Sequence, residues 1–493
     1  MLMKLKKFYL IAALMAAPAA SFATDYFVTL NGGSGTKDGS SWEKALPFNT
    51  FAEKFSNYQD GDVFYFQEGT YVVSEPLKVI GKGYTIIGGF AKGLTGTTND
   101  TPTPSATPTI FSGDINGDDV ASVGDAECLL SFTVAGEHDV IDDMKVVLQG
   151  LEFTCAFSNT KGNNGWTDRG ALHIAGCGSA NVKDCRFHGN VANSGESRQL
   201  GGMAFSGHSS NVVFEDCEFT DNWATSRGAA IKISSGKEGK GSTVLNRCLV
   251  ANNEVKEGTG SAILVQHGMA FYIINSTITD NKAGQTSGAI YSNGFANDYA
   301  RNLYIVNSTI AGNEGGSQVE MDANANIYVA NSIVVSDGTT DAFSFKGATH
   351  EALSGGMNIL GSDVNGVFTL QDATDNAEAG NNYEKIFGDN VLGANGVIEP
   401  LADKGNYTAS ALTAAVEDWG IEADLAEDQT GAKRADGSTP GAYAKSTATG
   451  ITGVEAVKGG TDDAYYTLQG VKLGSRPTAT GIYIHNGKKV IIR

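Results

Sequence analysis

Acidic and basic side chains gather around a short motif that recurs in the middle of the chain. One copy, DCEFTDNWATSRGAAI at Asp216–Ile231, combines a thiol with three carboxylates, an arginine and an asparagine. Carboxylates paired with cationic groups suit the recognition of sugars and their acid–base cleavage. Stacking of the repeats would align these groups in one groove for a sugar chain, although salt-bridged surface decoration stays open as the alternative. The candidate binding residues are Asp168, Arg169, Asp184, Asp216, Arg227 and Lys232.

A second cluster has the spacing of a calcium loop. The segment DINGDDVASVGD places oxygen-bearing side chains at positions one, three, five, nine and twelve of an EF-hand-like loop. The candidate metal ligands are Asp114, Asn116, Asp118 and Asp125, with Ser122 between them. The sixth position is Asp119 rather than glycine, and the flanks do not form two helical patterns. Two interpretations therefore remain, a calcium site or an acidic connection between strands, and no cofactor is expected to be required.

The local signatures of known sugar-cleaving chemistry are not assembled. Asp142 and Asp143 form a pair in an irregular segment, and SGHSS around His208 is only a fragment of a Gly-His-Gly motif. Histidines and cysteines do not cluster at zinc spacing. We therefore assign no catalytic residue and favour binding over an enzyme.

The motif itself is a repeat that predicts the fold. Copies begin at Asp184, Asp216, Arg247, Asn275 and Asn307, at intervals of about 30 residues, and the decayed copy NSIVVSD follows at Asn331. Each copy contains apolar stretches of three to five residues between Gly, Asn, Asp and Ser, which is typical of short strands and turns rather than helices. The pattern predicts an all-β solenoid whose coils stack as a parallel β-helix.

Stacked coils explain the residue types inside the repeat. Cys185, Cys217, Cys248 and Ser276 would form an inward ladder, as would the apolar residues two positions later. A third ladder is expected at a bend, where side-chain amides bond coil to coil and tolerate left-handed geometry. It comprises Asn190, Asn222, Asn253, Asn281 and Asn313. The cysteines could be disulfide-bonded between coils or remain stacked free thiols.

Composition restricts the partners. The 493-residue chain has a formal net charge of −20, with 63 glycines and only 9 prolines. Such an acidic chain is not expected to bind nucleic acid or an anionic membrane, because phosphate affinity comes from Lys and Arg. No segment after the N-terminal apolar run is long and apolar enough to span a bilayer.

The terminal segments predict further units. Residues 1–23 have a basic start, an apolar run and small residues at Ser21 and Ala23, the pattern of a secretory signal. We expect the β-helix over residues 24–345, with a short helix at NTFAEKF that covers its first coil, and its continuation and C-terminal cap over residues 346–444. A linker over 445–463 and a small β module over 464–493, with an Asn486–Gly487 hairpin turn, would follow.

These features resemble a known group of exported proteins. The segments YTIIGGF and TIFSGDINGDD are similar to secreted right-handed parallel β-helix proteins of pectin-lyase-like fold, and the CxFxxN…GxAI repeats are similar to those of polymorphic outer-membrane proteins. DQTGAKRADGSTPGAYA resembles the closing segment of surface β-helix proteins with interchangeable C-terminal anchors. GIYIHNGKKVIIR resembles the sorting modules of Bacteroidetes cargo of the type IX system, although an ordinary β-hairpin domain is the alternative.

The resemblance implies export to the cell surface or beyond, with secretion machinery as a partner of the C-terminal module. We expect a non-catalytic surface protein that binds or adheres to polysaccharides or host glycans; the alternative is a calcium-assisted polysaccharide lyase or a glycoside hydrolase. One criterion separates them. An Arg or Lys that converges with two or more carboxylates in one groove favours the enzyme, whereas a flat polar face favours the adhesin.

Overall fold

The computed structural model describes residues 23–445 and 465–492 with short gaps. The gaps are 98–100, 137–138, 160–169, 194–202, 235–240, 258–261, 285–287, 294–300, 323–324, 348–350, 365–366, 372–373, 402–404, 467–471, 474, 479–480 and 486–487. The chain divides into two compact units, residues 1–446 and 447–493. Residues 1–22 of the predicted signal segment and residues 446–463 of the predicted linker lie outside the described residues.

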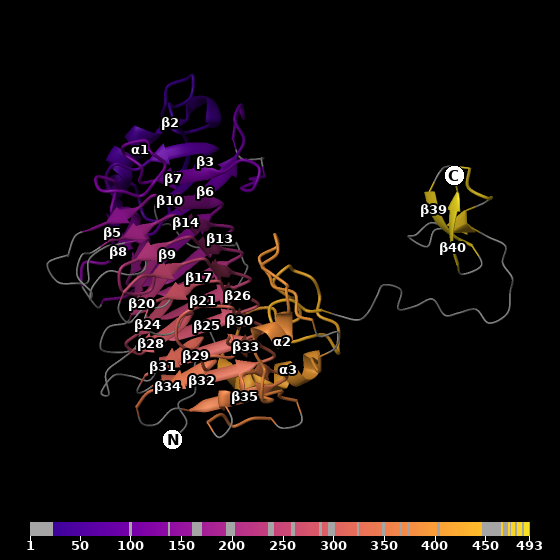
Figure 1. Ribbon diagram of the computed structural model, residues 1–493. Coiled ribbons are helices and arrows are strands. Elements are labelled where there is room, and N and C mark those ends of the chain that lie inside the picture. The colour runs from indigo at the N-terminus through magenta and orange to yellow at the C-terminus, as the bar shows by residue number, and fades with distance from the viewer. Residues whose placement is uncertain are drawn as a thin grey trace. The chain divides into compact units, whose positions relative to one another are not determined.

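The first unit is a solenoid of parallel sheets that run along its whole length (Figure 1). Sheet A contains β2 (Leu46–Pro47), β1 (Asp25–Thr29), β3 (Val63–Gln67), β6 (Thr85–Phe90), β9 (Ile141–Gln149), β13 (Cys177–Lys183), β17 (Asn211–Glu215), β21 (Ser242–Asn246), β25 (Ala270–Ile274), β29 (Arg301–Val306), β32 (Ala325–Ala330) and β35 (Ala352–Gly356). Sheet B contains β4 (Gly69–Val72), β7 (Thr109–Ser112), β10 (Leu151–Thr154), β14 (Arg186–His188), β18 (Glu218–Thr220), β22 (Leu249–Ala251), β26 (Thr277–Thr279), β30 (Thr309–Ala311), β33 (Ile333–Val335) and β36 (Ile359–Leu360).

Two further sheets complete each coil. Sheet C contains β5 (Leu77–Ile80), β8 (Cys128–Thr133), β12 (Gly170–Ala175), β16 (Phe205–His208), β20 (Ile231–Ser234), β24 (Ile263–Gln266), β28 (Ile290–Asn293), β31 (Val319–Met321) and β34 (Phe343–Phe345). The short sheet D contains β11 (Phe157–Ser158), β15 (Val191–Ala192), β19 (Trp223–Ala224), β23 (Glu254–Val255) and β27 (Lys282–Ala283). A full coil passes through sheets C, A, B and D in turn, so the all-β solenoid prediction is confirmed.

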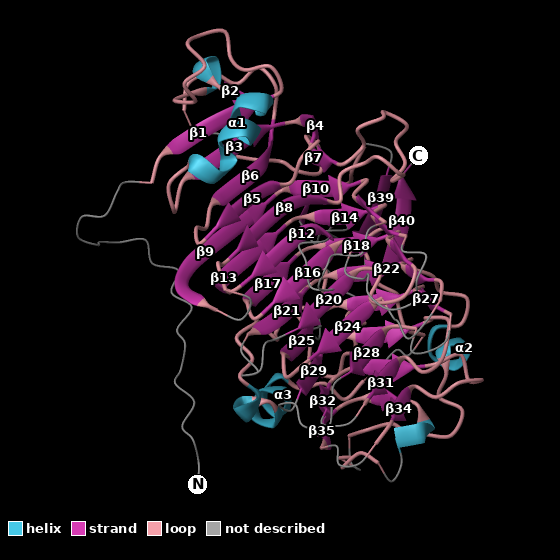
Figure 2. Ribbon diagram, turned by 90° about the vertical axis from the view of Figure 1, so that its left-hand side faces the viewer, coloured by secondary structure: helices cyan, strands magenta, loops and turns pink. Residues whose placement is uncertain are grey.

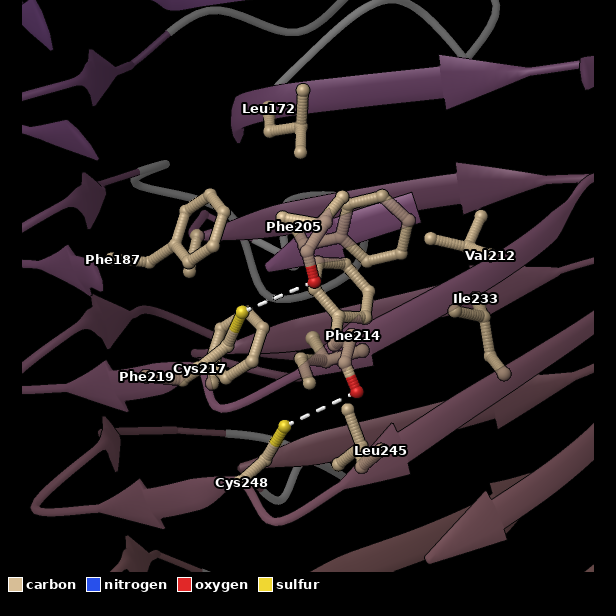
Figure 3. Close-up of a cluster of buried hydrophobic side chains, with 14 of the residues drawn as sticks. Leu172, Phe187, Phe205, Val212, Phe214, Cys217, Phe219, Ile233, Leu245 and Cys248 are labelled. Atoms are coloured by element: carbon tan, nitrogen blue, oxygen red, sulfur yellow. Dashed lines mark hydrogen bonds between the residues drawn. The ribbon is translucent and has the colours of Figure 1, made fainter. Parts of the chain in front are cut away.

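The core lies between the sheets and is built from stacked equivalents. Phe153, Phe187 and Phe219 stack with ring centroids 4.8 and 4.9 Å apart. The six cysteines are free and buried, so the stacked-thiol alternative holds. Figure 3 shows the Cys217 and Cys248 thiols each donating to a main-chain carbonyl, at 3.4 and 3.5 Å. The inward ladders are therefore confirmed.

The buried asparagine ladder joins the coils as expected. Each Nδ2 from Asn190 to Asn281 donates to the Oδ1 of the next asparagine at 2.8 or 2.9 Å. Each Nδ2 also reaches a main-chain carbonyl, so these buried amides are satisfied, as buried polar groups must be. The left-handed residue, however, is the one before each ladder asparagine: Asp221 precedes Asn222 with a φ of 57°. The exposed position makes the bend, which leaves the asparagine free to point inward.

Helices and a returning segment cover the ends and one side of the stack (Figures 1 and 2). Helix α1 (Phe48–Lys54), predicted from the sequence, closes the first coil, where Phe51 packs against Phe64 and Phe66 at ring-centroid distances of 5.0 Å. After the last coil, α2 (Tyr383–Phe387) and α3 (Ala409–Ala415) lie beside the later strands.

Residues 424–445, named here the closing segment, bond to the coils at the turn between sheets A and B. Asn275 and Asn307 donate through Nδ2 to the carbonyls of Asp424 and Leu425, both at 3.0 Å. Gly441 has a φ of 97°, and a Cβ there would meet Thr309 Oγ1 at 2.7 Å, so only glycine permits this close approach.

The second unit comprises residues 447–493. It is a small antiparallel sheet of β38 (Lys472–Leu473), β37 (Tyr465–Tyr466), β39 (Gly481–His485) and β40 (Lys488–Ile492). Strands β39 and β40 pair with His485 opposite Lys488, which is the pairing that the predicted hairpin requires.

Candidate functional site

A cleft of about 240 Å³ opens where sheets A and B meet in the first half of the solenoid. Three successive coils and a short stretch of the connection between β6 and β7 contribute to it. It is lined by Pro104, Ser105, Gly150, Leu151, Glu152, Asp184, Arg186, Asp216 and Glu218. Because equivalent positions of stacked coils lie side by side, the lining is a small array of aligned charges rather than a single constellation.

The fold dictates which side chains reach the cleft. Residues 184 and 216 hold the sharp turn between sheets A and B with φ values of 51° and 55°, a region in which Asp and Asn are among the best-tolerated side chains. In β14 and β18, Phe187 and Phe219 point into the core, so alternation turns their neighbours outward. We call the turn position the A/B corner; it comprises Gly150, Asp184, Asp216, Arg247, Asn275, Asn307, Asn331 and Met357.

The outer row of sheet B is an alternating charge ladder. Glu152, Arg186 and Glu218 are direct neighbours in the strand register. The Arg186 guanidinium lies 3.5 Å from a Glu152 oxygen and 3.4 Å from a Glu218 oxygen. The Glu152 carboxylate also lies 3.6 Å from His188 Nε2. Hydrogen bonding with His188 and the nearby Arg186 hold the pKa of Glu152 below its ordinary value.

The A/B corner carries a second charged network. Arg247 binds Asp216 through two bonds of 2.7 and 2.8 Å and donates to Glu215 at 2.6 Å. Lys183 donates to Glu215 at 2.9 Å. Burial alone would raise the pKa of Glu215, but Lys183 and Arg247 outweigh it and lower that pKa. Two carboxylates and two cations thus satisfy one another, and of these four residues only Asp216 lines the cleft.

Asp184 differs from its neighbours. It forms no ion pair with any described residue, and its side-chain contact is a 3.4 Å hydrogen bond from Gln149 Nε2. Burial and the adjacent Asp216 raise its pKa. Asp184 is therefore the cleft carboxylate best placed to accept a hydrogen bond, a proton or a positive charge from a ligand.

The structure brings together only part of the predicted set. Asp184 and Asp216 share the cleft, whereas Lys232 lies in β20 of sheet C and Arg227 precedes that strand; neither lines the cleft. Asp168 and Arg169 lie outside the described residues. The sequence reasoning missed Glu152, Arg186 and Glu218. Two of them could have been found from the repeat. Arg186 and Glu218 each stand between a cysteine and a phenylalanine that point inward, so strand alternation turns them outward.

The acidic loop forms a separate candidate metal site. Carboxylate oxygens of Asp114, Asp118 and Asp125 lie within 4.8 Å of one another. Asn116 is in the same loop, with its Oδ1 accepting from the Asp118 amide at 2.9 Å and its Nδ2 donating to Ser122. Three carboxylates are the oxygen ligands that calcium prefers. None of these residues lines the cleft, so an ion held here would not touch a ligand bound there.

Comparison with known proteins agrees with this architecture. A family model described as right handed beta helix region matches residues 170–383. The solenoid is a right-handed parallel β-helix. No curated protein matches the chain significantly. Among the described residues, no helix is long and apolar enough to cross a membrane.

The cleft contains the charged groups that would favour an enzyme, but most of these groups are already paired with one another. Arg186 converges there with more than two carboxylates, which is the arrangement taken to favour an enzyme. However, Arg186 is already paired with Glu152 and Glu218, and Asp216 is held by Arg247. Hydrolysis by two carboxylates needs both of them available for the reaction, and only Asp184 is unpaired here.

Proposed function

We propose that this β-helix is a non-catalytic, glycan-binding protein that is exported and displayed at the cell surface. The observation that supports this most directly is the cleft across three coils, which presents aligned carboxylates as acceptors for sugar hydroxyl groups. Stacked coils place polar groups at regular intervals along the solenoid axis, and a polymer can contact several of them at once. Arg186, the cation of the cleft, is already paired with Glu152 and Glu218, which leaves little capacity for acid–base chemistry and supports binding rather than cleavage.

The charge of the cleft narrows the ligand. Its lining contains four carboxylates and one guanidinium, so negative charge is in excess. Like charges placed side by side are repelled, and a polysaccharide of uronic acids would bring more negative charge. A neutral or cationic glycan fits better than a polyanion.

Glycan binding is tested with a panel of soluble polysaccharides and a blocked cleft. Ser105 is exposed at the rim, and Ser105→Trp would fill the cleft without touching the core. Ala106→Trp is the matched control, because this neighbouring residue is exposed but does not line the cleft. We expect Ser105→Trp to abolish binding and Ala106→Trp to preserve it. Equal binding by both variants would place the glycan site elsewhere.

Export is proposed from the N-terminal segment and the C-terminal module. The secretory pattern of residues 1–23 and the separate antiparallel sheet at residues 465–492 support it. Mass spectrometry of protein recovered from cells and medium should find a chain that begins after Ala23. A membrane-impermeant label applied to intact cells should modify the full-length protein but not a variant that lacks the C-terminal module. Protein that retains Met1 in the cytoplasm would contradict export.

A carbohydrate-cleaving enzyme is the second candidate. The raised pKa of Asp184 beside Asp216 favours it, because a general acid must hold its proton near the working pH. The polysaccharide panel should be incubated with and without calcium and assayed for new reducing ends and for unsaturated products. Turnover that disappears in Asp184→Asn would replace the binding proposal with an enzyme.

Calcium binding by the acidic loop is proposed separately. We expect calcium to raise the melting temperature of the wild type, and Asp118→Asn to remove most of that increase. Asp118 is the exposed member of the cluster, so its loss should not disturb the core. An identical melting temperature with calcium and with chelator would rule out a stabilising site.

A further inference from the structure

The cleft holds an acceptor that the protein itself leaves unmatched. Glu152 and Glu218 share Arg186, Glu215 is bound by Lys183 and Arg247, and Asp216 is bound by Arg247. Asp184 lies among these groups, and from the residues that the structure describes its side chain receives only the 3.4 Å hydrogen bond from Gln149. A ligand that delivers a positive charge to Asp184 would form an ion pair without breaking one.

The neighbourhood strengthens this preference. Asp216 lies one coil away at the equivalent corner position, and its charge adds to the negative potential at Asp184. The charge of Lys183 acts in the opposite direction, but its ammonium group lies 2.9 Å from Glu215 and 3.9 Å from Asp216, and it forms no ion pair with Asp184. Asp184 therefore keeps a carboxylate that a cationic ligand could pair with.

The geometry favours an organic cation over a metal ion. Among the described residues, the carboxylates that converge closely enough to share a metal ion are Asp114, Asp118 and Asp125, none of which lines the cleft. A metal ion needs several oxygen ligands at once. An ammonium group needs one carboxylate and a few neutral acceptors, and Ser105 and the main chain at Gly150 border the same cleft.

We infer that the cleft recognises a glycan unit bearing a free, protonated amine, with Asp184 as the residue that binds the ammonium group. This inference rests on the proposed glycan binding and specifies its ligand class as an amino sugar without N-acetylation. Volume agrees with it, because about 240 Å³ suits one or two sugar units rather than a folded partner. Asp184 then determines specificity, while the rest of the cleft supplies the contacts that any sugar would use.

The test compares two oligosaccharides that differ only at the amine. Chitohexaose carries free amines, and hexa-N-acetylchitohexaose has the same backbone with every amine acetylated. Calorimetry on the full chain, at a pH at which the free amines are protonated, should give tighter binding of chitohexaose by about twofold to fivefold, the range for a partly exposed ion pair. The preference should shrink as salt is added.

Asp184→Asn removes the charge but preserves the backbone. The same corner position is occupied by Asn275, Asn307 and Asn331 in later coils with φ values of 50°, 54° and 46°, so asparagine is compatible with the fold here. We expect this variant to lose the preference and to bind both oligosaccharides with the weaker affinity. Asp221→Asn, at an exposed left-handed residue that does not line the cleft, is the matched control and should retain the preference.

The outcomes separate this inference from the proposed function. Equal binding of both oligosaccharides by the wild type, or an unchanged preference in Asp184→Asn, would overturn the amine inference and leave glycan binding intact. Failure to bind any member of the polysaccharide panel as well as both oligosaccharides would overturn both.

Discussion

At the A/B corner, the coils from Asp184 to Arg247 carry charged side chains, whereas those from Asn275 to Asn331 carry asparagine. The backbone is the same in both regions, with φ between 46° and 55°. The two regions differ in what lies over them. The closing segment bonds to Asn275 and Asn307, whereas Asp184 and Asp216 border an open cleft. One backbone position thus borders an open cleft in one half and takes part in internal packing in the other.

The outer row of sheet B changes in the same place. Arg186 and Glu218 face the cleft, but the equivalent Thr277, Thr309 and Ile333 are buried. Thr277 donates to Gln429 Oε1 at 2.6 Å, and Thr309 Oγ1 accepts from the Ala442 amide at 3.0 Å. A charged side chain would be costly under this cover unless it were paired, because a buried ion needs a partner.

The largest expected effect on stability comes from replacing Arg434, which holds the closing segment against the later coils. Arg434 is almost fully buried and donates to the carbonyls of Glu427 and Gly441 at 3.0 and 2.7 Å. Burial lowers the pKa of its guanidinium to about 10. Arg434→Ala should destabilise the closing segment by about 3 kcal/mol, because several buried carbonyls lose their donor. Denaturant titration and proteolysis within residues 424–445 would measure this.

The neighbouring Lys433→Ala provides the control for that experiment, because Lys433 is exposed. It should leave both the unfolding midpoint and the cleavage rate unchanged. Equal protease resistance of the wild type and Arg434→Ala would show that the closing segment is held by its other contacts.

The next effect comes from giving the covered corner the chemistry of the open one. Asn307→Asp keeps the left-handed backbone but replaces the Nδ2 that donates to Leu425 and to Asn275. It also puts a carboxylate where the side chain is fully buried. We expect a loss of about 2–3 kcal/mol in the free energy of unfolding.

Asn252→Asp is the matched change on the surface. Asn252 is exposed and also left-handed, with a φ of 57°, so the substitution should alter stability by less than about 0.5 kcal/mol. If both variants were equally stable, burial at the corner would not be the reason for asparagine there.

Sequence repeats predicted much of this structure but not the division between its two halves. The Cys, Phe and Asn ladders follow from the repeat, because stacking puts equivalent positions in contact. The closing segment could not be placed in this way, since Asn275 bonds to a residue 149 positions later. Its effect was nevertheless visible as a change from charged residues at Arg186 and Glu218 to Thr277 and Thr309 at one repeat position.

The candidate site was predicted only in part for a related reason. Asp184 and Asp216 occupy equivalent positions of adjacent coils, so stacking alone brings them together. Arg227 and Lys232 were grouped with them by proximity in the sequence, but a coil turns through four sheets in about 30 residues, and these two belong to the side of sheet C. Residues line the same cleft when they occupy equivalent positions in successive repeats, and not because they are close in the sequence.

A smaller effect is expected where the two halves meet. Arg247→Asn gives the last charged corner the residue that the next coil carries, and it leaves Asp216 without its two-bond partner. We expect a loss of about 1–2 kcal/mol, since the Arg247 side chain is only 15% exposed. A double-mutant cycle that combines Arg247→Asn with Asp216→Asn should give an interaction energy of about 1 kcal/mol between the two residues. Strict additivity would mean that the pair contributes nothing to stability.

The smallest effect should have the opposite sign and should depend on pH. The pKa of Asp184 is raised in the folded protein, so ionisation of this carboxyl group destabilises the fold. Below the ordinary pKa of 3.8 the group is protonated in both states and the destabilisation is absent. It is present in full once the pH exceeds the folded-state pKa. Asp184→Asn should therefore stabilise the protein near neutral pH, by less than about 1 kcal/mol because the group is partly solvated. The gain should vanish in acid below that ordinary pKa. Thermal unfolding of the variant and the wild type across this pH range would measure it, and a variant less stable than the wild type at neutral pH would show that the Asp184 charge stabilises the corner even without a ligand.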